Sequence, residues 1–407
     1  MQIHPLDTEE IGLKTLEKHL IRTHTQKQLH VGVPKEHSVD EGRVSISPGG
    51  VRILSANGHK IRVEQGAGAD AKFTDQEYSE AGAEIVESTE STFDQADIIV
   101  KVAPLTPEEM TWVQGNQTII SALHLGSQEE AFFTNILKKS ATGIAYEFIK
   151  GADNEFPLVR MMHEITGSMA VQIAAHYLET SDTKEGGQGI MLGGISGVPP
   201  ATVAILGAGI TAEYAARTAL GYGAQVFVMD NDLAALRRLE NALDRRIITA
   251  VANEQYLRNA LKFADVLIGS AFQEGEKSSV WISEEMVRTM KTGSVIVDTV
   301  IDQGGCIDTS RPTTHSIPTY SQHGVTHYCV PNIPSKVART GTYALNNVLV
   351  PYVLAIGENG GIQECLWRNT ALRNGTYTYR GHLTKPSLGK AFGLPVREIE
   401  LLIASQI

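Results

Sequence analysis

The feature that most constrains the fold is a glycine-rich turn between an apolar run and a helical segment. Residues 202–206, "TVAIL", are typical of a buried strand, and residues 207–212, "GAGITA", follow them directly. This order matches G-x-G-x-x-A. Its first glycine makes a tight turn, its second admits close approach of a ligand, and its last small residue lets the helix pack on the strand. The turn therefore predicts a strand–turn–helix unit of a doubly wound α/β sheet.

An aspartate at the end of the next apolar run adds a ligand to this turn. Asp230 lies 23 residues after the first glycine, where a carboxylate can bind adenosine ribose hydroxyls and repel a 2′-phosphate. The N–H groups that open the helix suit a pyrophosphate. We predict a nicotinamide dinucleotide site that favours NAD over NADP, formed by Gly207, Ala208, Gly209, Ile210, Thr211 and Asp230. The alternative is a tight turn followed by an exposed aspartate.

Two series of short apolar runs alternate with helical segments. The second series has six runs, the number expected of a full dinucleotide-binding domain: residues 202–206, 225–230, 246–251, 264–271, 294–299 and 326–332. The first series has five: residues 29–36, 60–66, 96–104, 118–126 and 142–148. We predict an α/β protein with two Rossmann-like, doubly wound parallel sheets and an interdomain cleft.

The predicted domain limits follow from these series. Residues 1–28 are expected to form a helical extension, residues 29–157 with 340–407 a substrate domain, and residues 158–339 the NAD-binding domain. The tail is too small to fold alone, so we expect it to be mostly helical, to begin with a helix kinked near Pro351, and to return to the first domain.

Composition narrows the partners. The chain has 407 residues, 42% of them hydrophobic, and a formal net charge of −11, which argues against nucleic acid or an anionic membrane surface as partner. No run approaches the roughly 20 apolar residues of a membrane span, and the first residues do not read as a signal peptide. The three cysteines are scattered, which favours a reducing compartment. We expect a cytoplasmic protein without membrane or nucleic-acid partners.

Two motifs are rejected as metal or phosphate sites. Residues 163–167, "HEITG", lack the second histidine of the HExxH zinc motif, because Gly167 stands in its place. Residues 185–200 are glycine-rich but lack the Lys-Ser/Thr ending of a P-loop, so we expect a hairpin or a hinge there. No cysteine lies in a CxxC pair. We therefore predict no metal site.

A histidine ends one of the apolar runs. His124 lies within residues 121–127, "SALHLGS", and ligands of open α/β sheets bind outside the carboxyl ends of the strands. It could therefore be a proton shuttle that faces a cleft. It could equally be a core histidine satisfied by one hydrogen bond, and the residue alone does not decide between them.

Four further segments complete a pattern around the glycine turn: residues 34–51, 122–126, 295–306 and 310–335. With these segments the chain resembles alanine dehydrogenase closely, from about residue 29 to near its end. The related NAD-binding domain of proton-translocating transhydrogenase shares the architecture. "IDQGGC", "SRPTT" and "CVPNIPS" are the most specific stretches of the resemblance.

The resemblance implies an activity and assigns residues to it. The expected reaction is the reversible, NAD-dependent oxidative deamination of L-alanine, or a related small L-amino acid, to the 2-oxo acid and ammonia. Arg43 would hold the substrate carboxylate, and His124 would serve as acid and base in turn. Asp302 would lie beside the nicotinamide and the attacking water or ammonia, and Asn332 would contact cofactor or substrate. A homo-oligomer, hexamer or dimer, is also implied.

Each assignment has a plainer alternative. Arg43 could be a solvated surface arginine, and Asp302 could merely cap a turn. The family's catalytic pair, His124 and Asp302, is expected to meet the same nicotinamide ring across the predicted cleft. That expectation depends on the two domains closing together.

One departure from the family concerns the substrate. Where alanine dehydrogenases read Lys-Val-Lys-Glu-Pro, with the second lysine on the substrate, residues 101–104 read "KVAP" and Ala103 replaces that lysine. Lys101 lies about 7 Å back along the strand and would be strained in reaching forward. Arg160 and His163 stand where the family has small residues near the nicotinamide. Our hypothesis is that Arg160 supplies the missing cation or recognises a larger or acidic substrate; otherwise it points to solvent.

Two other functions remain open. The chain could be a transhydrogenase alpha-like NAD-binding subunit without its own substrate. It could also be a related dehydrogenase or imine reductase with a changed substrate. Losing one charged substrate contact should cost about 2–4 kcal/mol of transition-state binding, which would make alanine turnover slow. Whether the purified protein alone reduces NAD with an amino acid is the property that separates these functions.

Overall fold

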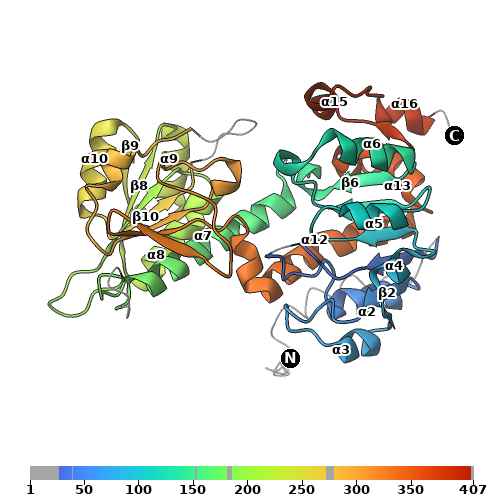
Figure 1. Cartoon of the computed structure of the whole chain (residues 1–407), viewed down its shortest axis with the longest axis horizontal. Coiled ribbons are helices and arrows are strands. Elements are labelled where there is room, and N and C mark those ends of the chain that lie inside the picture. The colour runs from blue at the N-terminus through green and yellow to red at the C-terminus, as the bar shows by residue number, and fades with distance from the viewer. Residues whose placement is uncertain (1–26, 39, 152–153, 181–185, 272–278, 405–407) are drawn as a thin grey trace, which may run out of the picture. The chain divides into compact units, whose positions relative to one another are not determined.

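The computed structural model describes residues 27–404, except 39, 152–153, 181–185 and 272–278. The predicted helical extension, residues 1–28, lies outside the described residues apart from its last two. The chain divides into two compact units (Figure 1): unit 1 contains the residues up to Val159 and from Val337 onward, and unit 2 contains residues 160–336. The expected boundaries, 157/158 and 339/340, lie two and three residues from these.

Unit 1 is built on an eight-stranded sheet in the order β15-β14-β6-β5-β4-β1-β2-β3. Six strands are parallel, and β14 and β15 join the edge in antiparallel fashion. The strands are β1 (His30–Val33), β2 (Lys60–Glu64), β3 (Ala83–Val86), β4 (Ile98–Val100), β5 (Thr118–Ser121), β6 (Thr142–Ala145), β14 (Thr376–Tyr379) and β15 (His382–Leu383).

Five of these strands coincide with the expected apolar runs, and β3, β14 and β15 lie outside them. The tail is mostly helical, as expected, but it also supplies two strands. β14 is a buried strand, although its sequence, "TYTY", looks polar. Its threonines are satisfied internally: the Thr378 hydroxyl accepts from the Gly143 N–H at 2.9 Å, and the Thr376 hydroxyl donates to the Leu372 carbonyl at 2.9 Å.

Short helices accompany this sheet, several of them opened by side-chain caps. Ser47 caps α2, and Thr106 forms a capping box with Glu109 at the start of α5. The long helix α12 packs on α2 and runs through Pro351 as one helix. The helices are α2 (Pro48–Ala56), α3 (Asp75–Glu80), α4 (Thr89–Phe93), α5 (Pro107–Trp112), η2 (Leu125–Ser127), α6 (Glu130–Lys138), η3 (Tyr146–Phe148), α12 (Ala338–Glu358), α13 (Ile362–Arg368), α14 (Thr370–Gly375), α15 (Pro386–Phe392) and α16 (Ile399–Ala404).

Unit 2 is built on a seven-stranded sheet in the order β12-β13-β11-β10-β7-β8-β9. Without the antiparallel edge strand β12, this is the doubly wound order 3-2-1-4-5-6, whose direction reverses beside β7. All six expected strands are present, and β12 is additional. The strands are β7 (Thr202–Leu206), β8 (Gln225–Asp230), β9 (Ile248–Val251), β10 (Val266–Gly269), β11 (Val295–Asp298), β12 (Thr319–Gln322) and β13 (Val325–Tyr328).

Helices accompany this sheet in unit 2, and the longest of them, α7, begins just before the unit does. Its Gly167 packs directly on α8, because a Cβ there would overlap the carbonyl oxygen of Thr211. The helices are α7 (Pro157–Leu178), α8 (Ile210–Tyr222), α9 (Leu233–Ala242), α10 (Glu254–Phe263), α11 (Glu284–Val287), η4 (Ile301–Gln303) and η5 (Ile333–Val337).

The glycine-rich stretch before β7 forms a hairpin, one of the two possibilities expected of it. Ile195 and Val198 exchange two backbone hydrogen bonds across Ser196 and Gly197. Both apolar side chains are exposed.

Candidate functional site

The glycine turn of unit 2 has a backbone that only glycine fits at its first position. Gly207 has φ +106°, and a Cβ there would lie 2.7 Å from the carbonyl oxygen of Ser270. Gly209 is the N-cap of α8 and offers no side-chain cap, and a Cβ there would meet no other atom within 4 Å. The start of α8 therefore presents backbone N–H groups next to open space, which suits a phosphate.

Asp230 is joined to this turn. Its Oδ2 accepts from the Ala208 N–H at 2.7 Å, and its Oδ1 accepts from the Asp232 N–H at 2.8 Å. Ala212, the last small residue of the motif, is fully buried. The predicted cofactor residues Gly207 to Thr211 and Asp230 thus form one constellation at the carboxyl ends of β7 and β8.

The loop that carries Asp302 is shaped by a second carboxylate. Buried Asp298 ends β11 and accepts from the N–H groups of Val300, at 3.2 Å, and Cys306, at 3.1 Å. Within this loop, a Cβ on Gly305, which has φ +76°, would lie 2.9 Å from Asp298 Oδ2. Sequence reasoning missed Asp298, although a carboxylate at the end of a strand "VIVD" is the kind of signal that marked Asp230.

Asp302 lies on η4, and its side chain reaches solvent. Surrounding protein atoms displace enough water to raise its pKa to about 6; the negative charge of Asp298 adds to this, and the N–H groups of Asp302 and Gln303 oppose it. Asp302 is therefore a carboxyl group that can change its proton state near neutrality.

The three remaining predicted residues of unit 2 lie in different settings. The main-chain oxygen of Asn332 accepts from His315 Nε2 at 2.8 Å. On α7, Arg160 pairs with Glu164 one turn later at 3.1 Å, and its side chain is 42% exposed. His163 is half-buried, and burial lowers its pKa.

In unit 1, Arg43 is buried rather than solvated, so the alternative of a surface arginine is wrong. Its Nε donates to Glu41 Oε1 at 2.7 Å and its Nη2 donates to Glu41 Oε2 at 2.6 Å. Burial opposes the guanidinium charge, but Glu41 outweighs it and raises the Arg43 pKa. Such a two-point pair fixes the plane of the guanidinium.

His124 follows β5 in a left-handed conformation, with φ 46° and ψ 56°, and it is exposed. This exposure does not fit a packed core histidine. Its pKa is lowered mainly by desolvation, with Arg43 adding to the effect and Glu147 and Glu41 opposing it. Arg43 and His124, predicted from distant parts of the sequence, are thus close enough to influence each other's charge.

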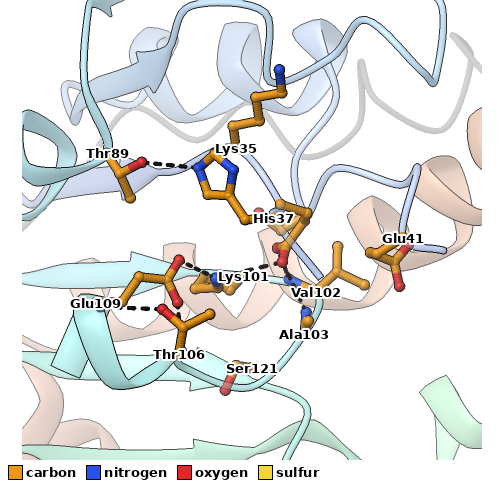
Figure 2. Close-up of polar contacts among 12 residues, drawn as sticks. Lys35, His37, Glu41, Thr89, Lys101, Val102, Ala103, Thr106, Glu109 and Ser121 are labelled. Carbon is orange, nitrogen blue, oxygen red and sulfur yellow. Dashed lines mark hydrogen bonds and ion pairs between the residues drawn. The ribbon is translucent and has the colours of Figure 1, made fainter. Parts of the chain in front are cut away.

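Lys101 is paired with buried carboxylates (Figure 2). Its side chain is fully buried, and its Nζ pairs with Glu109 and, at 3.5 Å, with Glu36. The Glu36 carboxylate also accepts from the N–H of Val102 at 2.6 Å and of Ala103 at 3.3 Å. Burial raises the pKa of Glu36 to about 7, against the attraction of Lys101. Lys101 is committed to this cluster.

Two domains of one known family match this chain. The alanine dehydrogenase/PNT N-terminal domain matches residues 32–166, and the C-terminal domain of the same family matches residues 170–386. The chain belongs to the alanine dehydrogenase/PNT family. The resemblance predicted from its motifs is therefore confirmed.

Individual members of this family match over most of their length. The chain is 43% identical to an alanine dehydrogenase of Methanococcus maripaludis over 371 residues, which cover 91% of this chain and 98% of that protein. It is 41% identical to an alanine dehydrogenase of Bacillus subtilis over 365 residues, 89% of this chain and 94% of that protein.

Solved structures agree with the predicted fold class. An L-alanine dehydrogenase superposes with a TM-score of 0.84 at 37% identity, covering 90% of this chain and 99% of that one. A transhydrogenase from Sinorhizobium meliloti, at 24% identity and TM-score 0.73, shares the fold; the match covers 88% of this chain and 99% of that one. Within the described residues, no helix of this family member is long and apolar enough to cross a membrane.

The structure groups the predicted residues by unit. Unit 1 contains Arg43 and His124; unit 2 contains the glycine turn, Asp230, Asp302, Asn332, Arg160 and His163. Sequence reasoning missed the carboxylates beside them, namely Glu41 beside Arg43, Glu147 beside His124 and Asp298 in the loop of Asp302, and it missed Glu36, which binds Lys101. Glu41 had a visible signal, since it stands two residues from Arg43 with opposite charge.

Proposed function

We propose that this chain is an NAD-dependent alanine dehydrogenase that oxidises L-alanine, or a related small L-amino acid, reversibly to the 2-oxo acid and ammonia. The observation that carries the proposal is the 43% identity to an alanine dehydrogenase over 91% of the chain. We further propose that it works in the cytoplasm as a homo-oligomer, a hexamer or a dimer.

NAD is the cofactor that the residues of unit 2 fit. The turn at Gly207 and the open backbone at Gly209 would take the pyrophosphate, and the Asp230 carboxylate would take the ribose hydroxyls. The negative charge of Asp230 opposes a 2′-phosphate. When bound, NAD accepts the hydride that leaves the substrate Cα.

The charged residues divide the remaining work. Arg43, oriented by Glu41, holds the substrate carboxylate. His124 takes a proton from the substrate amine or carbinol and returns it in the reverse direction; its lowered pKa leaves it neutral, and so able to accept a proton, at neutral pH. Asp302 orients water or ammonia beside the reacting carbon, and Asn332 contacts cofactor or substrate.

Arg160 is proposed as the cation that replaces the missing lysine, or as the group that recognises a larger or acidic side chain. The commitment of Lys101 to Glu36 and Glu109 supports this, because breaking a buried ion pair costs about 3–5 kcal/mol. The pairing of Arg160 with Glu164 is partly exposed and worth only about 0.3–0.5 kcal/mol. The pair with Glu164 therefore costs little to break. His163 is proposed to lie near the nicotinamide on the same helix.

The test is NADH formation by the purified protein with NAD and a panel of L-amino acids. We expect L-alanine, or one small or acidic relative, to be oxidised selectively. A protein that binds NAD but oxidises no amino acid would contradict the proposal and favour a transhydrogenase-like subunit. The Arg160→Ala variant is expected to raise KM for the preferred amino acid without changing KM for NAD.

A further inference from the structure

The two oxygens of the Glu147 carboxylate lie in different surroundings. Oε1 accepts from the N–H of Leu123 at 2.8 Å and from the N–H of His124 at 3.1 Å. Oε2 is excluded from solvent, and it has no hydrogen-bond partner among the residues that the structure describes. A buried carboxylate oxygen without a donor is unfavourable by about 1–3 kcal/mol or more, so this arrangement calls for a donor in the working enzyme.

The backbone of His124 is one that Glu147 must hold. A left-handed conformation is unfavourable for a residue with a Cβ and persists only where its surroundings enforce it. Glu147 binds the N–H side of this residue. On its other side, the His124 carbonyl accepts from the N–H and the hydroxyl of Ser127, both at 2.9 Å. The peptide is thus fixed at both ends, and only the imidazole is left to rotate.

The charges around the ring single out Glu147. Among the described residues, three charged groups act on the His124 imidazole: Glu147, from the segment after β6, and Arg43 and Glu41, from the segment after β1. Arg43 and Glu41 are committed to each other by two hydrogen bonds. The charge of Glu147 also helps to raise the pKa of two tyrosines, Tyr146 and Tyr377. Burial raises the pKa of Tyr146 and of Tyr377, so both stay protonated, and the Tyr146 hydroxyl donates to the Val102 carbonyl.

We propose that Glu147 is the positioning residue of His124: Oε1 fixes its backbone, and Oε2 accepts a hydrogen bond from one ring nitrogen. This inference rests on the proposed function, since it gives the other ring nitrogen to the substrate. When His124 takes the substrate proton, both ring nitrogens carry hydrogen and the Glu147 carboxylate balances the new positive charge. A carboxylate that orients a histidine fixes its tautomer and raises its basicity.

The variant Glu147→Gln tests this, because its amide oxygen can still accept from the two N–H groups while the charge is lost. We expect kcat to fall about 10- to 100-fold with an unchanged KM for NAD. The acid limb of the kcat/KM profile for oxidation should move down by about one pH unit, since the carboxylate that favours the imidazolium is gone. Glu147→Asp keeps the charge and should leave that limb near its wild-type position.

The matched control is Glu130→Gln, an exposed carboxylate at the start of α6, which should match wild type in both rate and profile. A Glu147→Gln variant with wild-type kcat and an unmoved acid limb would overturn the proposal. So would a loss of activity in Glu147→Gln without any movement of the limb, because that result is expected of a purely structural role.

A second readout does not need activity or the variant's full stability. NMR titration of the His124 ring, assigned by comparison with His124→Gln, should give a lower pKa in Glu147→Gln than in wild type. An equal pKa in the two proteins would contradict the proposed hydrogen bond between Glu147 and the His124 ring. If wild type oxidises no amino acid while this difference is found, the proposed function fails and the positioning of His124 stands.

Discussion

In each unit the predicted site residues lie near the carboxyl ends of the parallel strands. The interactions that position these residues differ between the two units. In unit 2 the carboxyl ends of the strands are shaped by backbone: a glycine turn, and two aspartates, Asp230 and Asp298, that accept peptide N–H groups. In unit 1 the same ends carry buried titratable side chains, Arg43 with Glu41 and Lys101 with its two glutamates. A site shaped by the backbone depends on a few glycines, whereas a site shaped by buried ion pairs depends on both members of every pair.

The largest expected effect is the loss of the cation at the centre of the unit 1 cluster. Lys101→Met leaves Glu36 and Glu109 buried without a counter-charge, so we expect the free energy of unfolding to fall by about 3–5 kcal/mol. Denaturant unfolding measures it. Arg217→Met, which removes the exposed partner of Glu213 in unit 2, should cost less than about 0.5 kcal/mol. Equal losses in the two variants would erase the contrast between the units.

The backbone side of the comparison is tested at the glycine turn. Gly207→Ala forces a side chain into the left-handed region against Ser270 and should cost about 1–3 kcal/mol of stability as well as NAD affinity. Gly209→Ala has open space and should keep its thermal stability while binding NAD more weakly. Thermal unfolding and NAD titration check both variants. A Gly207→Ala protein as stable as Gly209→Ala would show that the turn tolerates a side chain.

Glu36 in unit 1 should make one contribution to the pH dependence of stability. The pKa of Glu36 is raised from 4.5 to about 7 in the folded protein, so its protonated form is the one that folding favours. Its contribution is therefore complete below about pH 4.5 and is lost as pH rises through about 7. Relative to wild type, Glu36→Gln should gain about 1–3 kcal/mol of unfolding free energy between pH 5 and pH 8. Parallel curves for the two proteins would contradict this.

The smallest expected effect concerns the exposed pair on α7. Arg160→Ala should lower the free energy of unfolding by no more than about 0.5 kcal/mol, because Arg160 and Glu164 are both partly exposed. Chemical denaturation beside wild type measures this, with Arg217→Ala as control. A loss as large as that of Lys101→Met would mean that Arg160 is structural, and would remove the basis for its proposed role toward substrate.

The feature shaped by the backbone could be predicted from the sequence, whereas the buried ion pairs could not. The turn at Gly207 was predictable because its backbone demands particular residues in a fixed order. The burial of Lys101 was not, since lysines are almost always exposed unless paired and both partners lie elsewhere in the chain. Strands β12 and β14 were missed because "TYSQ" and "TYTY" look polar, although in β14 the hydroxyls of Thr376 and Thr378 bond internally.

The contacts that join the two ends of the chain had no sequence signal at all. The Val44 N–H donates to the Thr342 hydroxyl at 3.0 Å across 298 positions, and the Ser47 hydroxyl donates to Asn346 Oδ1 at 3.0 Å across 299. Neither pair follows a periodicity or a motif. They hold the segment that carries Arg43, which is why its burial appears only in the structure.

Those long-range contacts also dictate an order of events during synthesis. Unit 2 is one continuous segment, but Ser47 leaves the ribosome 299 residues before Asn346, a wait of roughly 15–60 s at ordinary elongation rates. From the synthesis of β6 until that of β14, the β6 strand also lacks this neighbour and exposes an unpaired edge, which is the kind of surface that invites aggregation. A nascent chain stalled before residue 376 is therefore the form of this protein that most needs a chaperone.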